Sequence, residues 1–460
     1  MRDKLMAFPA NFKWGTATAS YQIEGAASQD GKGPSTWDMM CRKENAIFNN
    51  DTGDTTCDHY NRYEEDVEIM KQMSMQAYRF SICWSRVLPQ GTGKVNEAGL
   101  DFYSRLVDKL LEDGIEPWVT LFHWDYPYHL YTRGGWLNPK SPEWFAEYTE
   151  IIVDKLSDRV SNWMTLNEPY CFLWLGHKTG NHAPGDKLGL EQVLLATHNA
   201  LKSHGMAVKT IREKAKKQPN IGFAPVGKSF YPQTNSQEDI KAAYEMTYSF
   251  DSPDLWNSTW INDAVFKGCY PQDGLRVFGK SVPKFTDEDF KIISEPLDFF
   301  GFNFYRAPAV RMGDDGPEIL SPKAGDPLTH FNWPLSPEGL EWAAKFHHER
   351  YKLPLVVTEN GMANCDWVLS DGTVRDYQRI DYLKRYITAL HRAIEAGADI
   401  RGYFVWTTMD NFEWAEGFSK RFGLVHVDYQ TQKRTPKLSA WWYKKVAQTN
   451  GLHALEDGLD

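Results

Sequence analysis

The sequence is short of cysteine, of long apolar runs and of positive charge, and each shortage excludes a class of protein. Its 460 residues include six cysteines and no CxxC pair, which argues against a disulfide framework and against a thiolate zinc site. No apolar stretch reaches the roughly 18 residues that would cross a membrane. Lys and Arg number 51 against 61 Asp and Glu, so a nucleic-acid partner is not expected.

The start of the chain also lacks a targeting signal. Residues 1–20 carry two early cations but no apolar core before a small-residue cleavage site, which is unlike a signal peptide. We therefore expect a cytoplasmic protein whose thiols are reduced and buried.

Aromatic residues, by contrast, are abundant: Phe, Tyr and Trp make up 14% of the chain. A length of 460 residues is compatible with three domains of about 150 residues or with one large α/β barrel. No Pro/Ser-rich linker or low-complexity tract divides the chain. We expect one domain over residues 1–460, with a core at about 8–448.

Short apolar runs alternate with longer amphipathic stretches, such as Leu100–Leu111 and Asp381–Ala396, each followed by a glycine that is typical of a helix end. Several of the runs lack polar alternation, as strands buried on both faces do. Eight such runs between helices predict a (β/α)₈ TIM barrel with long loops at the C-terminal face of its strands, and a doubly wound sheet is the alternative. The expected strands are Phe12–Ala17, Ala77–Cys83, Pro117–Phe122, Ser161–Leu166, Ile221–Ala224, Leu297–Phe302, Leu353–Thr358 and Gly402–Trp406.

Two carboxylates follow expected strands, Glu168 in Thr-Leu-Asn-Glu-Pro and Glu359 in Thr-Glu-Asn-Gly. In a barrel, the C-terminal ends of all strands meet at one mouth, even for residues far apart in the chain. A carboxylate pair at that mouth suits cleavage of a glycosidic bond, since one group protonates the leaving oxygen and the other attacks or activates water. A single strand-end glutamate is as often a solvated or capping residue.

The two motifs together resemble glycoside hydrolase family 1, the β-glucosidase family. Further ordered matches extend the resemblance over nearly the whole chain: Phe12-Lys-Trp-Gly-Thr-Ala-Thr-Ala-Ser-Tyr-Gln-Ile-Glu-Gly25, Tyr78-Arg-Phe-Ser81, Phe122-His-Trp-Asp125, Asn411-Phe-Glu-Trp-Ala-Glu-Gly417 and Arg421-Phe-Gly423.

The resemblance implies a TIM barrel and a retaining, two-step mechanism on a small-molecule β-glycoside. It assigns Glu359 as nucleophile and Glu168 as acid and then base, with Arg79, Tyr305 and Asn303 supporting the reaction. A retaining enzyme requires a separation of about 5–5.5 Å between the two carboxyl groups. The resemblance also implies a sugar-binding set consisting of Gln22, His123, Trp124, Asn167, Trp406, Glu413, Trp414, Phe422 and Trp333.

Several alternatives stay open. A β-galactosidase or β-fucosidase would use similar residues. A phospho-β-glycosidase is disfavoured because Glu413 would face the phosphate dianion, and a thioglucosidase because that branch has Gln in place of Glu168. A carbohydrate-binding protein without activity would be expected to lack one of the carboxylates. No metal, cofactor, nucleic acid or membrane is expected as a partner, and the choice between monomer and homo-oligomer is open.

Overall fold

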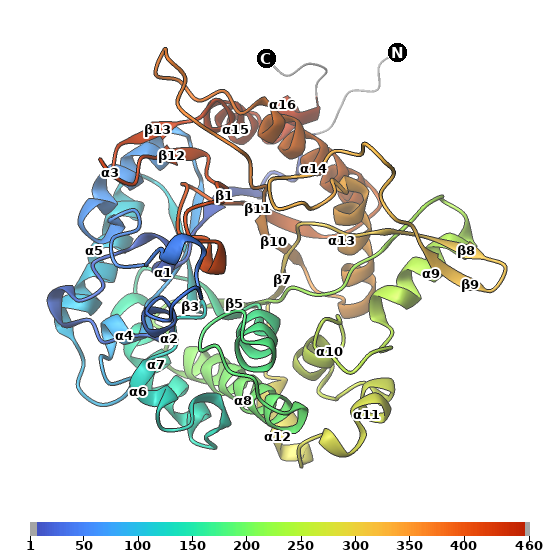
Figure 1. Ribbon diagram of the computed structural model, residues 1–460, viewed down its shortest axis with the longest axis horizontal. Coiled ribbons are helices and arrows are strands. Elements are labelled where there is room, and N and C mark those ends of the chain that lie inside the picture. Colours follow the sequence, from blue (N-terminus) through green and yellow to red (C-terminus); the bar gives the residue numbers. More distant parts are fainter. Residues whose placement is uncertain (1–6, 456–460) are drawn as a thin grey trace.

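Eight parallel strands form a closed barrel at the centre of the computed structural model, which describes residues 7–455 (Figure 1). Around the barrel the order is β1, β2, β3, β4, β5, β7, β10 and β11, and β11 pairs with β1 to close the ring. The strands are β1 (Lys13–Ala17), β2 (Ala77–Ser81), β3 (Glu116–Phe122), β4 (Asn162–Asn167), β5 (Asn220–Ala224), β7 (Phe299–Asn303), β10 (Leu355–Asn360) and β11 (Ile400–Trp406).

Every expected strand corresponds to one barrel strand, with bounds that agree within two residues. The closed ring confirms the barrel and shows that the doubly wound alternative is wrong. The start of β10 was placed too early because the expected range included Pro354, which has no N–H to donate to a sheet.

Helices cover the outside of the barrel (Figure 1). The two helices expected from periodicity are α5 and α14. Within residues 7–455, no helix is long and apolar enough to cross a lipid bilayer. The longer helices are α3 (His59–Gln72), α5 (Glu97–Glu112), α7 (Ser141–Leu156), α8 (Leu190–Lys214), α9 (Gln237–Tyr248), α13 (Pro337–Tyr351), α14 (Tyr377–Glu395) and α15 (Leu438–Gln448). The shorter ones are α1 (Ser20–Ile23), α2 (Thr36–Met40), α4 (Trp84–Val87), α6 (Tyr128–Tyr131), α10 (Trp260–Lys267), α11 (Gln272–Phe278), α12 (Asp287–Ile293) and α16 (Leu452–Leu455).

Two small sheets outside the barrel were not expected from the sequence. One contains β6 (Tyr231–Pro232), β8 (Ala309–Gly313) and β9 (Gly316–Ile319), and the other pairs β12 (Val425–Val427) with β13 (Arg434–Pro436). Strands this short span too few residues to show a hydrophobic period. They lie within the long connections that follow the barrel strands.

Aromatic rings fill the lower part of the barrel. The Trp118 ring on β3 lies 5.1 Å from the Phe404 ring on β11 and 5.5 Å from the Phe299 ring on β7, measured between centroids. Glycines on neighbouring strands make this room, since a Cβ at Gly15 would lie 2.6 Å from Phe404 and one at Gly222 would lie 2.2 Å from Phe299. The barrel interior is therefore a packed core, and polar groups can gather at the C-terminal ends of the strands.

Buried ion pairs fix the loops on the C-terminal side of β10 and β11. The Lys437 ammonium, itself fully buried, lies 2.6 Å from an Asp366 oxygen and 2.7 Å from an Asp410 oxygen. Arg379 on α14 also pairs with Asp366 and bonds the carbonyl of Phe422. Although burial raises the pKa of Asp366, Arg379 and Lys437 hold it down at about 2.

The described cysteines are unpaired, and the expectation that all six are buried is wrong for two of them. Cys41, Cys57, Cys83 and Cys171 are buried, whereas Cys269 and Cys365 are exposed. Cys269 follows α10 and Cys365 follows β10. In these connections no hydrophobic pattern indicates which side chains face the core.

We predict that Lys437→Met destabilises the protein by about 3–5 kcal/mol, because it leaves two buried carboxylates without their shared cation. Denaturant unfolding at pH 7 measures the change. The matched control is Lys433→Met, at an exposed lysine of the same segment, which should stay within about 0.5 kcal/mol of the wild type. Equal stability of the two variants would contradict the role of this ion-pair network.

Candidate active site

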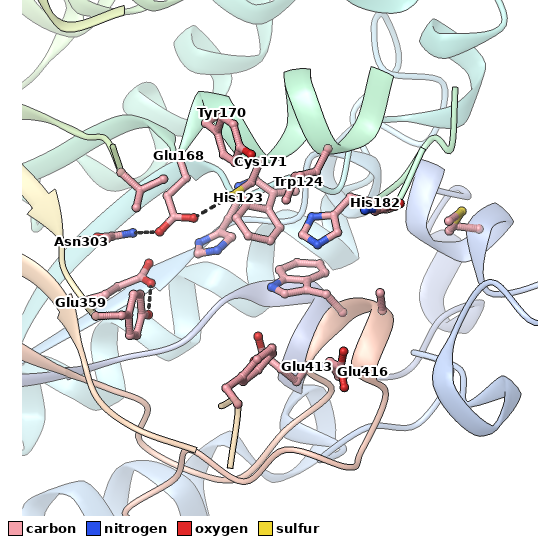
Figure 2. A pocket seen from close by; sticks show the side chains of 18 of the residues that line it. His123, Trp124, Glu168, Tyr170, Cys171, His182, Asn303, Glu359, Glu413 and Glu416 are labelled. Atoms are coloured by element: carbon pink, nitrogen blue, oxygen red, sulfur yellow. Dashed lines mark hydrogen bonds between the residues drawn. The ribbon is translucent and has the colours of Figure 1, made fainter. Parts of the chain in front are cut away.

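A cavity of about 980 Å³ opens at the C-terminal ends of the barrel strands, and both Glu168 and Glu359 line it (Figure 2). The structure brings the whole expected site together. Eleven of its members line the cavity: His123, Trp124, Glu168, Asn303, Tyr305, Trp333, Glu359, Trp406, Glu413, Trp414 and Phe422. The other three lie directly behind the wall, where Gln22 bonds Glu413, Arg79 bonds Glu359, and Asn167 bonds Asn303.

Glu359 is held on both of its oxygens. The Arg79 guanidinium donates to Oε1 at 2.7 Å, and the Tyr305 hydroxyl donates to Oε2 at 2.7 Å. Burial raises the pKa of Glu359, and Arg79 and Tyr305 oppose that rise by stabilising the ionised form. Since Arg79 is in direct contact with Glu359, this carboxyl group is the one that ionises first.

Glu168 has a different environment. It follows β4 with a left-handed backbone, at φ 43°, and its N–H donates to the Ala224 carbonyl at 2.9 Å. Asn303 Nδ2 donates to Oε1 at 2.7 Å and the Cys171 thiol donates to Oε2 at 3.0 Å (Figure 2). Burial and the charge of Glu359 together raise the pKa of Glu168 to about 7. The site therefore holds one carboxyl group paired with a cation and a second that titrates only near neutral pH.

A chain of hydrogen bonds orients the amides beside these carboxyls. Asn167 Oδ1 accepts from Arg79 at 2.6 Å and from Asn303 at 3.0 Å, and Asn167 Nδ2 lies 3.1 Å from His123 Nε2. Because the Asn167 amide donates to Nε2, the imidazole proton belongs on Nδ1. Burial, and then the charge of Arg79, lowers the pKa of His123 well below its usual value, so His123 is neutral.

Buried polar atoms around the cavity that have no hydrogen-bond partner among residues 7–455 include His123 Nδ1, His182 Nδ1 and Gln22 Oε1. The Gln22 amide nitrogen donates to the Phe412 carbonyl at 2.9 Å and to a Glu413 oxygen at 3.3 Å. The Gln22 amide oxygen is left free to accept a hydrogen bond. Unsatisfied buried donors and acceptors are costly in a folded protein. A ligand with several hydroxyl groups supplies both kinds of partner.

A third carboxyl group, Glu413, lies at the same end of the cavity. Burial, with the charges of Glu359 and Glu168, raises its pKa to about 8. Protonated Glu413 can both donate and accept a hydrogen bond. It therefore suits a neutral hydroxyl group.

Aromatic rings form the remaining walls. Trp414 packs on Trp124 with ring centroids 4.5 Å apart, and Trp333 stacks on Phe331 at 4.5 Å. Trp406, at the end of β11, is approached closely by the residue that follows β10: a Cβ on Gly361 would lie 1.8 Å from the Trp406 carbonyl oxygen. Flat apolar faces beside polar groups suit the C–H side of a sugar ring.

Reasoning from the sequence missed several lining residues. Cys171, Tyr170 and His182 come from the segment after β4, and Trp256 and Phe331 come from later loops. Tyr170 packs against Trp256 with centroids 4.8 Å apart, which adds an aromatic wall toward the opening. Tyr170 and Cys171 could have been found from the sequence, because they lie two and three residues after Glu168. Within the described part of the chain, no three His, Cys, Asp or Glu side chains are grouped to hold a metal ion.

Comparisons with known proteins show the family of the chain. Residues 4–452 match the family described as glycosyl hydrolase family 1. Beta-glucosidase A of Thermotoga maritima is 45% identical over 97% of this chain and 98% of its own, and beta-glucosidase A of Acetivibrio thermocellus is 44% identical over 97% and 99%. The solved structure of the Thermotoga maritima beta-glucosidase in complex with glucoimidazole has a TM-score of 0.89 at 44% identity, covering 97% of this chain and 99% of that one. The chain belongs to glycosyl hydrolase family 1.

Proposed function

We propose that the chain is a retaining β-glucosidase. It releases terminal non-reducing β-D-glucosyl residues from cellobiose, short oligosaccharides and aryl or alkyl β-glucosides. The observation that carries the proposal is the pair of buried carboxyl groups in one cavity, of which Glu359 contacts a cation and Glu168 does not. Such a pair supplies a nucleophile and an acid at the same pH.

In the first step, a Glu359 oxygen attacks the anomeric carbon of the bound sugar. Glu168 gives its proton to the glycosidic oxygen, and the leaving alcohol departs. Tyr305 and Arg79, which hold the two Glu359 oxygens, orient the nucleophile for this attack. The product is a covalent glucosyl ester of Glu359.

In the second step, Glu168 acts as a base. Ionised by the first step, it accepts a proton from water as the water oxygen attacks the anomeric carbon, and the bond to Glu359 breaks. Two displacements at one carbon preserve its configuration. The carboxyl separation of about 5–5.5 Å that this route requires stays a prediction.

The sugar-binding groups support a neutral glycoside as substrate. Gln22 and Glu413 lie together and offer an acceptor and a donor to adjacent hydroxyl groups. His123 offers its Nδ1 proton, and the family resemblance includes Asn167 in the same sugar-binding set. A 6-phosphate is disfavoured because its negative charge would lie beside Glu413, a buried carboxyl group that supplies no positive charge and would repel the phosphate once ionised.

The choice of sugar rests on similarity. The relatives described above are named beta-glucosidases, and the Thermotoga maritima enzyme also has a solved complex with galacto-hydroximolactam. A panel of p-nitrophenyl β-D-glucoside, β-D-galactoside, β-D-fucoside and cello-oligosaccharides tests the proposal through kcat/KM. We expect the glucoside and the cello-oligosaccharides to be cleaved. If none of these substrates is cleaved, the alternative of a carbohydrate-binding protein without activity is favoured.

We further propose that residues of about 8–448 act as one domain and that the enzyme works in the cytoplasm. Support for the location comes from the cysteines, all six of which are unpaired, as is usual in a reducing compartment.

The first prediction for the mechanism concerns Glu359→Gly. Loss of the nucleophile should lower kcat for p-nitrophenyl β-glucoside by at least roughly 10³-fold. Azide or formate should partly restore turnover, since either anion fits the space left by the carboxylate. The control is Glu318→Gln, an exposed carboxylate on β9, which should keep wild-type activity. Full activity of Glu359→Gly would overturn the nucleophile assignment.

Glu168→Gln tests the acid. Its effect should depend on the leaving group, because a poor leaving group needs the proton and an activated phenol does not. We expect kcat/KM to drop by about 10²–10⁴-fold for cellobiose and by far less for 2,4-dinitrophenyl β-glucoside. An equal drop for both substrates would argue against general-acid catalysis by Glu168.

The pH dependence follows from the raised pKa of Glu168. The acid must be protonated, so kcat/KM for cellobiose should fall as pH rises through about 7. Removing the like charge in Glu359→Gln should make Glu168 titrate at lower pH, which the carboxyl stretching band in an infrared titration reports. The two carboxyls interact, so each apparent pKa belongs to the pair. A profile that stays flat well above neutral pH would contradict the assignment.

A further inference from the structure

The Cys171 thiol contacts Glu168, and the proposed mechanism has not used this contact. Cys171 begins a π-helical segment, Cys171–Thr179, directly after the Glu168 turn. Its N–H donates to the Glu168 carbonyl at 2.9 Å, and its Sγ donates to Glu168 Oε2 at 3.0 Å (Figure 2). Main chain and side chain of Cys171 thus both bond the residue that carries the acid.

The other Glu168 oxygen has a partner that cannot change its role. Asn303 Nδ2 donates to Oε1 at 2.7 Å, and Asn303 Oδ1 accepts from the Thr358 hydroxyl at 2.6 Å. The amide is therefore locked with its nitrogen toward Glu168, and an amide N–H donates but does not accept. Oε1 consequently accepts a hydrogen bond whatever the charge of the carboxyl group, and Oε2 is the better place for the proton.

The partner of Oε2 can adapt. A thiol has one hydrogen that rotates about the Cβ–Sγ bond, and sulfur is also a weak acceptor. We infer that Cys171 is a positioning residue for the acid/base: its S–H donates to Glu168 Oε2 when the carboxyl group is ionised and turns away when Oε2 carries the catalytic proton. The inference rests on the proposed role of Glu168.

The proton balance of the two steps is simple. In the first step the proton leaves Oε2 for the glycosidic oxygen, and the thiol hydrogen turns toward the new carboxylate. In the second step a proton from water returns to Oε2, and the thiol hydrogen turns away. The thiol keeps its own hydrogen throughout, and no oxidant or further reactant is needed.

Other charged and titratable groups also shift the pKa of Glu168, and the thiol contributes one shift among several. Glu359 raises the pKa of Glu168, whereas Cys171, Asn303 and Arg79 lower it. Burial, with the charge of Glu168, raises the pKa of the Cys171 thiol well above its usual value, so the thiol stays protonated and able to donate. The groups that face Glu168 from other elements are Arg79 on β2, Tyr305 after β7, Glu359 on β10 and Glu413 after β11.

Two variants separate the hydrogen bond from packing. Cys171→Val keeps an apolar side chain of similar size but removes the donor, so the upper limb of the pH profile of kcat/KM for cellobiose should move up by about 0.5–1 pH unit. Cys171→Ser keeps a donor and should bring the limb back toward the wild-type position. The matched control is Cys57→Val, at a buried thiol that donates to the Asp410 carbonyl at 3.1 Å, and should leave the limb unmoved.

The inference would be overturned if the upper limb of the pH profile did not move in Cys171→Val. It would also be overturned if the limb moved equally in Cys171→Val and Cys171→Ser. These outcomes differ from failure of the proposed function, in which the wild type itself would not turn over the glycoside panel.

A second measurement needs neither catalysis nor a folded Val variant. The S–H stretching band shifts to lower frequency when the thiol donates, and the infrared difference between wild type and Cys171→Ser isolates the Cys171 band. We expect this band to move to lower frequency as pH rises through the titration of Glu168, and to stop titrating in Glu168→Gln. If the S–H band were constant with pH in the wild type, or still titrated in Glu168→Gln, the proposed turning of the Cys171 thiol hydrogen would be contradicted.

Discussion

The site depends on one electrostatic constraint: ionising both of two carboxyl groups that are buried in the same cavity costs free energy, because like charges repel and burial disfavours charge. Arg79 resolves the competition, because its guanidinium lies 2.7 Å from Glu359, whereas the hydrogen bonds to Glu168 come from neutral groups, Asn303 and Cys171. Glu359 therefore ionises first and Glu168 titrates only near neutral pH. The division of labour between nucleophile and acid follows from this one placement of a cation.

The barrel makes that placement rigid. Arg79 comes from β2, Glu168 follows β4 and Glu359 lies on β10, so three strands must hold their register for the charges to meet. The aromatic layer below, with Trp118 between Phe299 and Phe404, fills the interior and fixes the strands. Above it, buried ion pairs around Lys437 hold the loop that carries Phe422. Rigid support of this kind reduces the reorganisation needed during the reaction.

Much of the fold was predictable, because barrel strands buried on both faces stand out as apolar runs between amphipathic helices. Closure of the sheet was predicted too, but the pattern of runs alone also fits an open doubly wound sheet, and the family resemblance favoured the barrel. The small sheets β6–β8–β9 and β12–β13 were missed because such short strands show no period. In the site, the named residues do gather at one cavity, but the wall toward the opening, with Tyr170 and Trp256, comes from loops whose paths the sequence pattern does not specify.

By itself, the sequence determined the strand order along the chain, the identity of the two carboxyl groups and the family, because these depend on local pattern and on ordered motifs. The tertiary structure decided which carboxyl group meets Arg79, which amide is locked toward Glu168, and that a thiol three residues along the chain bonds the acid. Proton affinity depends on burial and on atoms within a few ångströms, and those neighbours come from strands far apart in sequence. Only the folded barrel brings them together.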